Sequence, residues 1–299
     1  MRLGTKSDLL SKCLEPLTTT TGDVPEVDVL VIDGAAIVNM LKPSTSRTFD
    51  DYADLIFCPY IRKHLETVAR VDIVWDAYID NSLKAATRSK RGKGIRRRVQ
   101  GKNKIPQNWQ SFLRDDDNKK ELFSFLSQQL AQQNFAEKVV VATNALDVLC
   151  YTHDDVSSLP LCSHEEADTR IMVHVSDAVK HGLKRVMIRS VDTDVAVIAV
   201  SLFREIGADE LWLAFGSGKS FRYISIHDLS NALAIEISHT LPVFHAFTGC
   251  DTVSSFAGKG KKTAWETWMA FEDVTLAFSI MIDQPTSPDM DLIMALIER

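Results

Sequence analysis

The stretch KRVMIRSVDTDVAVIAVSLFREIG, residues 184–207, predicts a strand followed directly by a helix. A short apolar run comes first, two aspartates (Asp192 and Asp194) end it, and a helix-like apolar pattern follows. Short continuous apolar runs are typical of strands buried on both faces of a parallel sheet. The stretch therefore predicts one strand-to-helix unit of an α/β fold, with acidic side chains where the strand ends.

Similar runs recur on both sides of this stretch. Further strands are predicted at VDVLVID (27–33), VDIVWD (71–76), EKVVVAT (137–143), DELWLAF (209–215) and SFRYISI (220–226). Helical patterns separate them and are expected over residues 48–69, 118–133, 163–182 and 227–247. Strands that alternate with helices indicate right-handed βαβ units and a mostly parallel central sheet.

The composition excludes several classes of protein. The chain has 299 residues, a formal net charge of -6 and five scattered cysteines without a CxxC pair, which argues against a disulfide framework or a zinc site. It has no apolar run near the roughly 18 residues that a membrane span needs. Its first residues, polar and Thr-rich, resemble no signal peptide. We expect a nuclear or cytoplasmic protein without a membrane partner.

Acidic side chains stand at the ends of several predicted strands. Asp33 and Asp76 end two of them, and SHEEADTRI (163–171) opens a helix with Glu166 and Asp168. Each acid alone has an ordinary structural interpretation, such as the S-x-x-E capping box that Ser163 forms with Glu166. Because the carboxyl ends of parallel strands meet at one edge, several acids are expected there together. Carboxylates without His or Cys suit hard cations such as Mg²⁺ or Mn²⁺.

The order of these motifs resembles the 5′ nuclease superfamily, which includes flap endonucleases and has a PIN-like fold. The motifs are VIDGAAIV, VWDAY, EEADTRI, VDTDVAV and TGCDTVSSFAGKGKKTAWE, from about residue 28 to 270. The resemblance implies a three-layer PIN-like domain with a mostly parallel sheet and a helix–two-turn–helix region. The implied boundaries are a leader at 1–26, a nuclease core at 27–240 with a basic gateway at 80–110, and the helical region at 241–299.

The resemblance also implies a set of metal ligands for two Mg²⁺ or Mn²⁺ ions. These ligands are Asp33, Asp76, Glu166, Asp168, Asp192, Asp194 and Asp251. Asp168 stands where many flap enzymes have Glu, and Glu165 has no counterpart in the family motif.

Two basic stretches complete the resemblance. Ten Lys or Arg residues and no acid lie between Lys84 and Lys104, where the family has a gateway for single-stranded nucleic acid. Lys84, Arg88 and Arg91 are expected to act on the scissile phosphate, and Lys93, Arg96, Arg97 and Arg98 to bind the nucleic-acid backbone. Gly258, Lys259, Gly260 and Lys261 match the family's duplex anchor, although Lys261 replaces a proline there. A solvated loop or a nuclear localisation signal is the alternative for the first stretch.

The function implied is metal-dependent hydrolysis of phosphodiester bonds in DNA with a 5′ end or flap. A PIN-like ribonuclease and a catalytically silent relative that binds nucleic acid are the alternatives. A phosphatase of the haloacid dehalogenase type is disfavoured, because its D-x-D motif would follow the first strand. We find no sliding-clamp box in the sequence, and we expect a monomer.

Overall fold

The computed structural model describes residues 5–78, 94–151, 159, 166–251, 253 and 258–283. The strands are β1 (Thr20–Thr21), β2 (Val29–Asp33), β3 (Arg70–Val74), β4 (Val139–Asn144), β5 (Asp147–Cys150), β6 (Arg185–Ser190), β7 (Glu210–Phe215) and β8 (Arg222–Ser225). The longer helices are α1 (Gly34–Met40), α3 (Cys58–Leu65), α6 (Asp116–Ala131), α7 (Ala167–Lys180), α8 (Thr193–Ile206), α9 (Ile226–Ala232), α10 (Ile235–Phe247), α11 (Lys261–Ala270) and α12 (Asp273–Asp283). The shorter ones are η1 (Leu9–Leu14), η2 (Glu15–Leu17), α2 (Phe49–Tyr52), η3 (Ala53–Phe57), α5 (Trp109–Phe112) and η4 (Gly218–Ser220).

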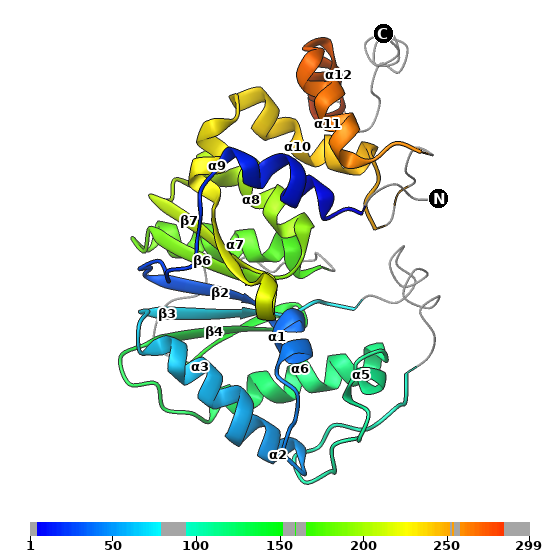
Figure 1. Cartoon of the computed structure of the whole chain (residues 1–299). Helices are drawn as coiled ribbons and strands as arrows, with labels where there is room; N and C mark the ends of the chain where they lie inside the picture. The colour runs from blue at the N-terminus through cyan, green and yellow to red at the C-terminus, as the bar shows by residue number, and fades with distance from the viewer. Residues whose placement is uncertain are drawn as a thin grey trace. The chain divides into compact units, whose positions relative to one another are not determined.

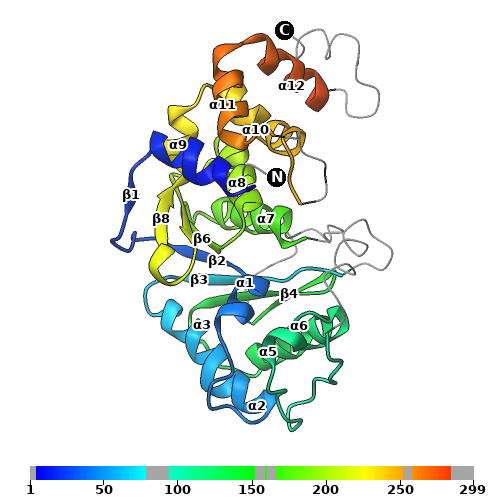
Figure 2. The same cartoon turned by 45° about the vertical axis from the view of Figure 1, so that its right-hand side comes forward.

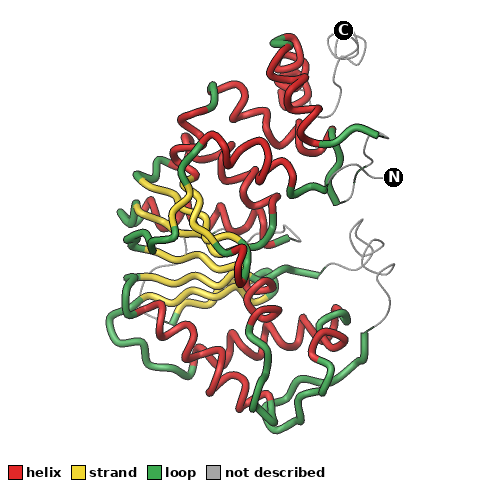
Figure 3. Tube along the Cα trace, viewed as in Figure 1, coloured by secondary structure: helices red, strands yellow, loops and turns green. Residues whose placement is uncertain are grey.

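The strands form one eight-stranded sheet in the order β1-β8-β7-β6-β2-β3-β4-β5 (Figure 1; strands are yellow in Figure 3). The pairs β2–β3, β2–β6 and β3–β4 are parallel, whereas β4–β5 and β1–β8 are antiparallel. Every residue of β2 and β3 is buried, so both faces of the sheet are covered there. The predicted α/β fold with a mostly parallel sheet is confirmed.

The chain divides into two compact units, which we describe separately. The core unit comprises Pro25–Val191 and Ala214–Phe221, and the helical unit comprises Met1–Val24, Asp192–Leu213 and Arg222–Arg299. Among the described residues, no helix is both long enough and apolar enough to cross a membrane.

In the core unit, a buried aromatic stack fixes the ends of β2 and β3. The Trp75 ring stacks with Phe57 and Phe123, whose centroids are 5.9 and 4.4 Å away, and its Nε1–H donates to Ser127 Oγ at 2.8 Å. Trp75 also covers Gly34, where a Cβ atom would come within 2.1 Å of the indole ring. Glycine is therefore required beside Asp33, and the two strand ends are held close together.

A buried ionic network fastens α7 to β3 within the core unit. Asp72 accepts two hydrogen bonds from Arg70, both at 2.7 Å, and lies 2.7 Å from His174 Nδ1 on α7. Arg70 also pairs with Asp177 on α7 at 2.8 Å. Burial disfavours charge on Asp72, but the bonds to Arg70 and His174 outweigh it and lower the pKa of this carboxyl. The start of α7 is therefore fixed relative to the end of β3.

In the helical unit, α10 packs on α8 and α12, and η1 packs on α8 and α11 (Figure 2). Trp265 and Trp268 of α11 are buried and pack on Phe244. Residues 9–17, placed in the predicted leader, form η1 and η2, and Leu9 and Leu14 are fully buried.

Two details of the predicted elements differ in the structure. The helix predicted over 48–69 is divided into α2, the π-helical η3 and α3, because Pro59 in the first turn of α3 has no N–H to donate. The strands β1 and β5 were not predicted. Both are short, and they form the two edges of the sheet.

Candidate metal centre

Asp33 ends β2 and caps α1. Its Oδ1 accepts from the N–H of Ala36 at 2.9 Å, and its Oδ2 accepts from Ser190 Oγ at 2.9 Å. Ser190 is the last residue of β6, the parallel neighbour of β2. Asp33 is thus a buried carboxylate at the carboxyl end of the strands, as predicted.

Asp76 follows β3 and reaches the start of α7. Its Oδ1 accepts from the N–H of Ala167 at 3.0 Å, and its Oδ2 accepts from the Tyr78 hydroxyl at 3.1 Å. Ala167 is the first residue of α7, and Glu166 at the N-cap makes no side-chain capping bond. The side chain that caps α7 is therefore that of Asp76, which follows β3, and not that of Glu166. Ser163 and Glu165 lie outside the described residues.

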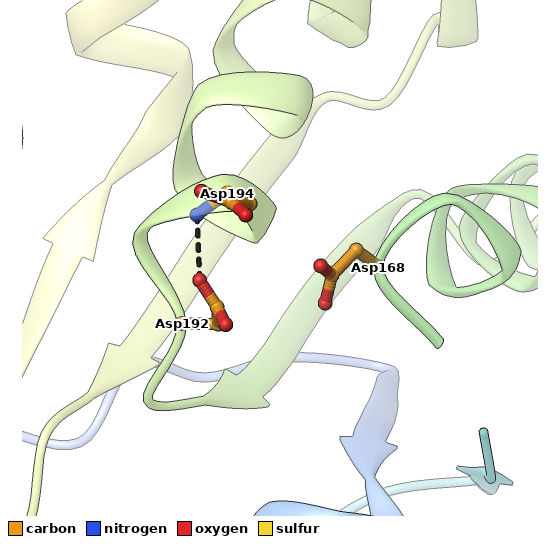
Figure 4. Close-up of side chains that lie close together, drawn as sticks. All are labelled: Asp168, Asp192 and Asp194. Carbon is orange, nitrogen blue, oxygen red and sulfur yellow. Dashed lines mark hydrogen bonds between the residues drawn. The ribbon is translucent and has the colours of Figure 1, made fainter. Parts of the chain in front are cut away.

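The acids of the helical unit surround the ammonium of one lysine. Lys6 Nζ lies 2.8 Å from Asp192 Oδ1, 3.2 Å from Asp194 Oδ2 and 2.8 Å from Asp251 Oδ2. Asp192 also caps α8, since its Oδ1 accepts from the N–H of Asp194 at 2.9 Å (Figure 4). Three of the predicted metal ligands, from two segments of the chain, therefore contact the ammonium of Lys6.

A buried histidine holds the second oxygen of Asp194. His245 Nε2 lies 2.8 Å from Asp194 Oδ1, and the side chain of His245 is 6% exposed. His245 Nδ1 has no hydrogen-bond partner among the described residues. If Nε2 carries the proton, it donates to Asp194 and leaves Oδ2 directed to the cation.

The charges of this cluster stabilise one another. Burial opposes the ionised form of Asp194, but the bond with His245 and the nearby Lys6 outweigh it and lower the pKa of Asp194 to about 2. Burial likewise opposes the charge on Lys6, yet the hydrogen bonds to Asp192 and Asp251 raise its pKa above the usual range. Asp194 is therefore ionised and Lys6 is protonated at neutral pH.

Lys6 and His245 were not found by sequence reasoning. Lys6 lies in a polar segment without periodicity, and His245 lies in a helix without a motif of its own. Their partners lie 186 and 51 residues away along the chain, so no local pattern indicates them.

The predicted basic gateway is described in part. Lys84, Arg88, Arg91 and Lys93 lie outside the described residues. The Arg96 guanidinium bonds to Glu121 and, at 2.9 Å, to Asn118, which fastens this segment to α6. Arg97 and Arg98 are exposed, and the main-chain N–H of Arg97 donates to Asn118 Oδ1 at 2.8 Å.

The predicted duplex anchor separates into exposed and buried positions. Gly258 has φ +73°, a conformation that favours glycine, and Lys259 beside it is exposed. Gly260 is the N-cap of α11. Lys261 is 4% exposed, and its ammonium donates to the carbonyl of His245 at 2.6 Å and to Thr248 Oγ1 at 2.7 Å. Lys261 therefore ties α11 to α10, and of the two lysines in the predicted anchor only Lys259 is exposed to solvent.

The structure has a mostly parallel sheet with carboxylates at the ends of its strands. This is the arrangement that the motifs predict. Among solved structures, the chain is similar to the catalytic core of Rad2 in complex with DNA substrate, with a TM-score of 0.50 at 12% identity, covering 99% of this chain and 78% of that one. It is also similar to the bacteriophage T5 flap endonuclease in a complex with DNA and metal ions, with a TM-score of 0.47 at 13% identity, covering 90% and 83%. No family model and no curated protein matches the chain. The likeness to the Rad2 catalytic core agrees with the fold that the motifs predict.

Proposed function

We propose that this chain is a nuclease that hydrolyses DNA with a 5′ end or flap and depends on Mg²⁺ or Mn²⁺. The observation that carries the proposal is the ammonium of Lys6 between Asp192, Asp194 and Asp251, at 2.8–3.2 Å from each. Carboxylates directed at one cation are a donor set that suits hard divalent ions. The fold shared with the Rad2 catalytic core, a structure solved with DNA substrate, supports the same proposal.

The proposed ligands are the seven acids that the motifs imply. Asp192 and Asp194 belong to the helical unit, and Asp168, in the first turn of α7, belongs to the core unit. Asp33, Asp76, Glu166 and Asp251 complete the proposed set. Two bound ions would supply an activated water and neutralise charge on the leaving oxygen.

The described residues have distinct tasks in this proposal. Asp192 and Asp76 hold the first turns of α8 and α7, so each combines a positioning role with a ligand role. His245 fixes the carboxylate of Asp194 by one oxygen. Arg97, Arg98 and Lys259 offer exposed positive charge to phosphates, which would favour recognition of backbone over base sequence.

Cleavage of labelled 5′-flap DNA, single strands, duplex and RNA tests the proposal, with Mg²⁺, Mn²⁺ or EDTA. We expect metal-dependent cleavage of flap DNA that is lost in Asp194→Asn. The matched control is Asp23→Asn, an exposed acid after β1 in the same unit, which should cut like the wild type. Equal cleavage with EDTA would refute metal dependence, and cleavage of RNA alone would identify a ribonuclease.

A further inference from the structure

Lys6 belongs to a segment that is built into the helical unit. Leu9 and Leu14 of η1 are fully buried, and η1 packs on α8 and α11. Next to Lys6, the N–H of Thr5 donates to Asp8 at 3.2 Å, and Asp8 pairs with Lys12 at 3.0 Å. The buried leucines fix the backbone after Lys6, so its ammonium is brought to the acids by the fold of the segment.

The ammonium matches the cluster in both charge and geometry. It carries three N–H donors, and three different carboxylates lie within 3.2 Å of it. Without a cation, like charges at this spacing repel one another. Lys6 therefore supplies a counter-charge that the acids of this unit need when no other cation is bound.

A divalent ion and Lys6 cannot occupy this place together. Mg²⁺ binds carboxylate oxygens at about 2.0–2.1 Å, inside the volume that the Lys6 ammonium fills. The two cations also repel each other. Metal entry at Asp192, Asp194 and Asp251 thus requires the ammonium to leave.

We propose that Lys6 is an internal counter-cation that competes with the divalent metal, so that the N-terminal segment sets the metal affinity of this centre. The inference rests on the proposed function, since it assumes that these acids bind metal. In the metal-free protein Lys6 holds the carboxylates in place. In the metal-bound protein Lys6 is displaced and available to a phosphate.

The test measures Mn²⁺ binding by thermal shift and calorimetry, without nucleic acid. In Lys6→Met the Mn²⁺ concentration for half saturation should fall by about tenfold. The metal-free variant should melt at a lower temperature, so its gain on Mn²⁺ addition should be larger. Lys6→Arg keeps the charge and should bind Mn²⁺ no better than the wild type.

Lys12→Met is the matched control, because Lys12 lies in the same segment, is 53% exposed and pairs with Asp8. It should leave the Mn²⁺ affinity unchanged. Equal Mn²⁺ affinity of Lys6→Met and wild type would overturn the inference and leave the proposed metal site standing. Absence of Mn²⁺ binding in the wild type would overturn both.

A second measurement covers the case in which Lys6→Met does not fold. In the unmutated protein, Mg²⁺ titration should shift the side-chain NMR signal of Lys6 and leave that of Lys12 in place. A Lys6 signal unchanged at saturating Mg²⁺ would also overturn the inference.

Discussion

Asp76 accepts a hydrogen bond from the main-chain N–H of Ala167, 91 residues further along the chain, at 3.0 Å. The carboxylate after β3 thereby serves as the cap of α7. Asp76 is therefore a helix cap, and it is also one of the metal ligands proposed above.

Substitution of Asp76 separates these two roles. Asp76→Asn keeps an oxygen that accepts from Ala167, so we expect an unchanged free energy of unfolding and a loss of cleavage. Asp76→Ala removes the cap as well and should cost about 1 kcal/mol of stability. Urea unfolding beside single-turnover cleavage measures both. If Asp76→Asn cut flap DNA at the wild-type rate, Asp76 would be a structural cap alone.

Lys259 and Lys261 should respond in opposite ways to substitution by Met. Lys261→Met leaves the carbonyl of His245 without its buried partner, so we expect a loss of about 1–3 kcal/mol of stability. Lys259→Met should leave the free energy of unfolding unchanged and weaken duplex binding. Chemical denaturation and fluorescence anisotropy provide the comparison, and a stable Lys261→Met with poor duplex binding would assign Lys261 to the DNA instead.

The three gateway arginines that the structure describes, Arg96, Arg97 and Arg98, should also differ. Arg97→Gln/Arg98→Gln should weaken binding to all DNA sequences alike and reduce the salt dependence by up to about one unit of slope per lost phosphate contact. Arg96→Gln should mainly lower stability, because Arg96 is held by Glu121 and Asn118. Salt-titrated binding and thermal melting distinguish these effects. A double variant that binds like wild type would make this stretch a solvated loop.

The Asp72 network makes stability depend on acid pH. The pKa of Asp72 is lower in the folded chain than in the unfolded one, so its contribution is complete above the unfolded value of about 3.9 and is lost as pH falls through the folded value. At neutral pH, Asp72→Asn should cost roughly 3–5 kcal/mol, because Arg70 stays buried with a weaker partner. The difference from wild type should shrink as the pH falls below 4, as measured by urea unfolding. Asp54→Asn, an exposed acid in η3, is the control and should show a constant, small difference.

Strands and strand-end acids could be predicted because both are local properties of the sequence. The sequence runs that form β2, β3, β4 and β6 are apolar and short. An aspartate stands at the end of three of them, β2, β3 and β6. β5 was missed because its hairpin turns at Ala145, whose φ of +53° carries no Gly or Asn signal. Lys6 and His245 depend on packing between distant segments, and the burial of Lys261 depends on α10 lying beside α11.

Lys6 and Asp192 are in contact but lie 186 residues apart along the chain, and this has a consequence for biosynthesis. The helical unit is assembled from three stretches of chain, so Lys6, Leu9 and Leu14 leave the ribosome well before α8 and α11 exist. At about 5–20 residues per second, the 186 residues between Lys6 and Asp192 take about 10–40 s to translate. During that time Leu9 and Leu14 lack the helices α8 and α11 on which η1 packs in the folded unit, so we expect a chaperone to bind this apolar segment. The core unit, by contrast, has β2, β3 and β4 available by the time residue 144 is made, and is expected to begin folding first.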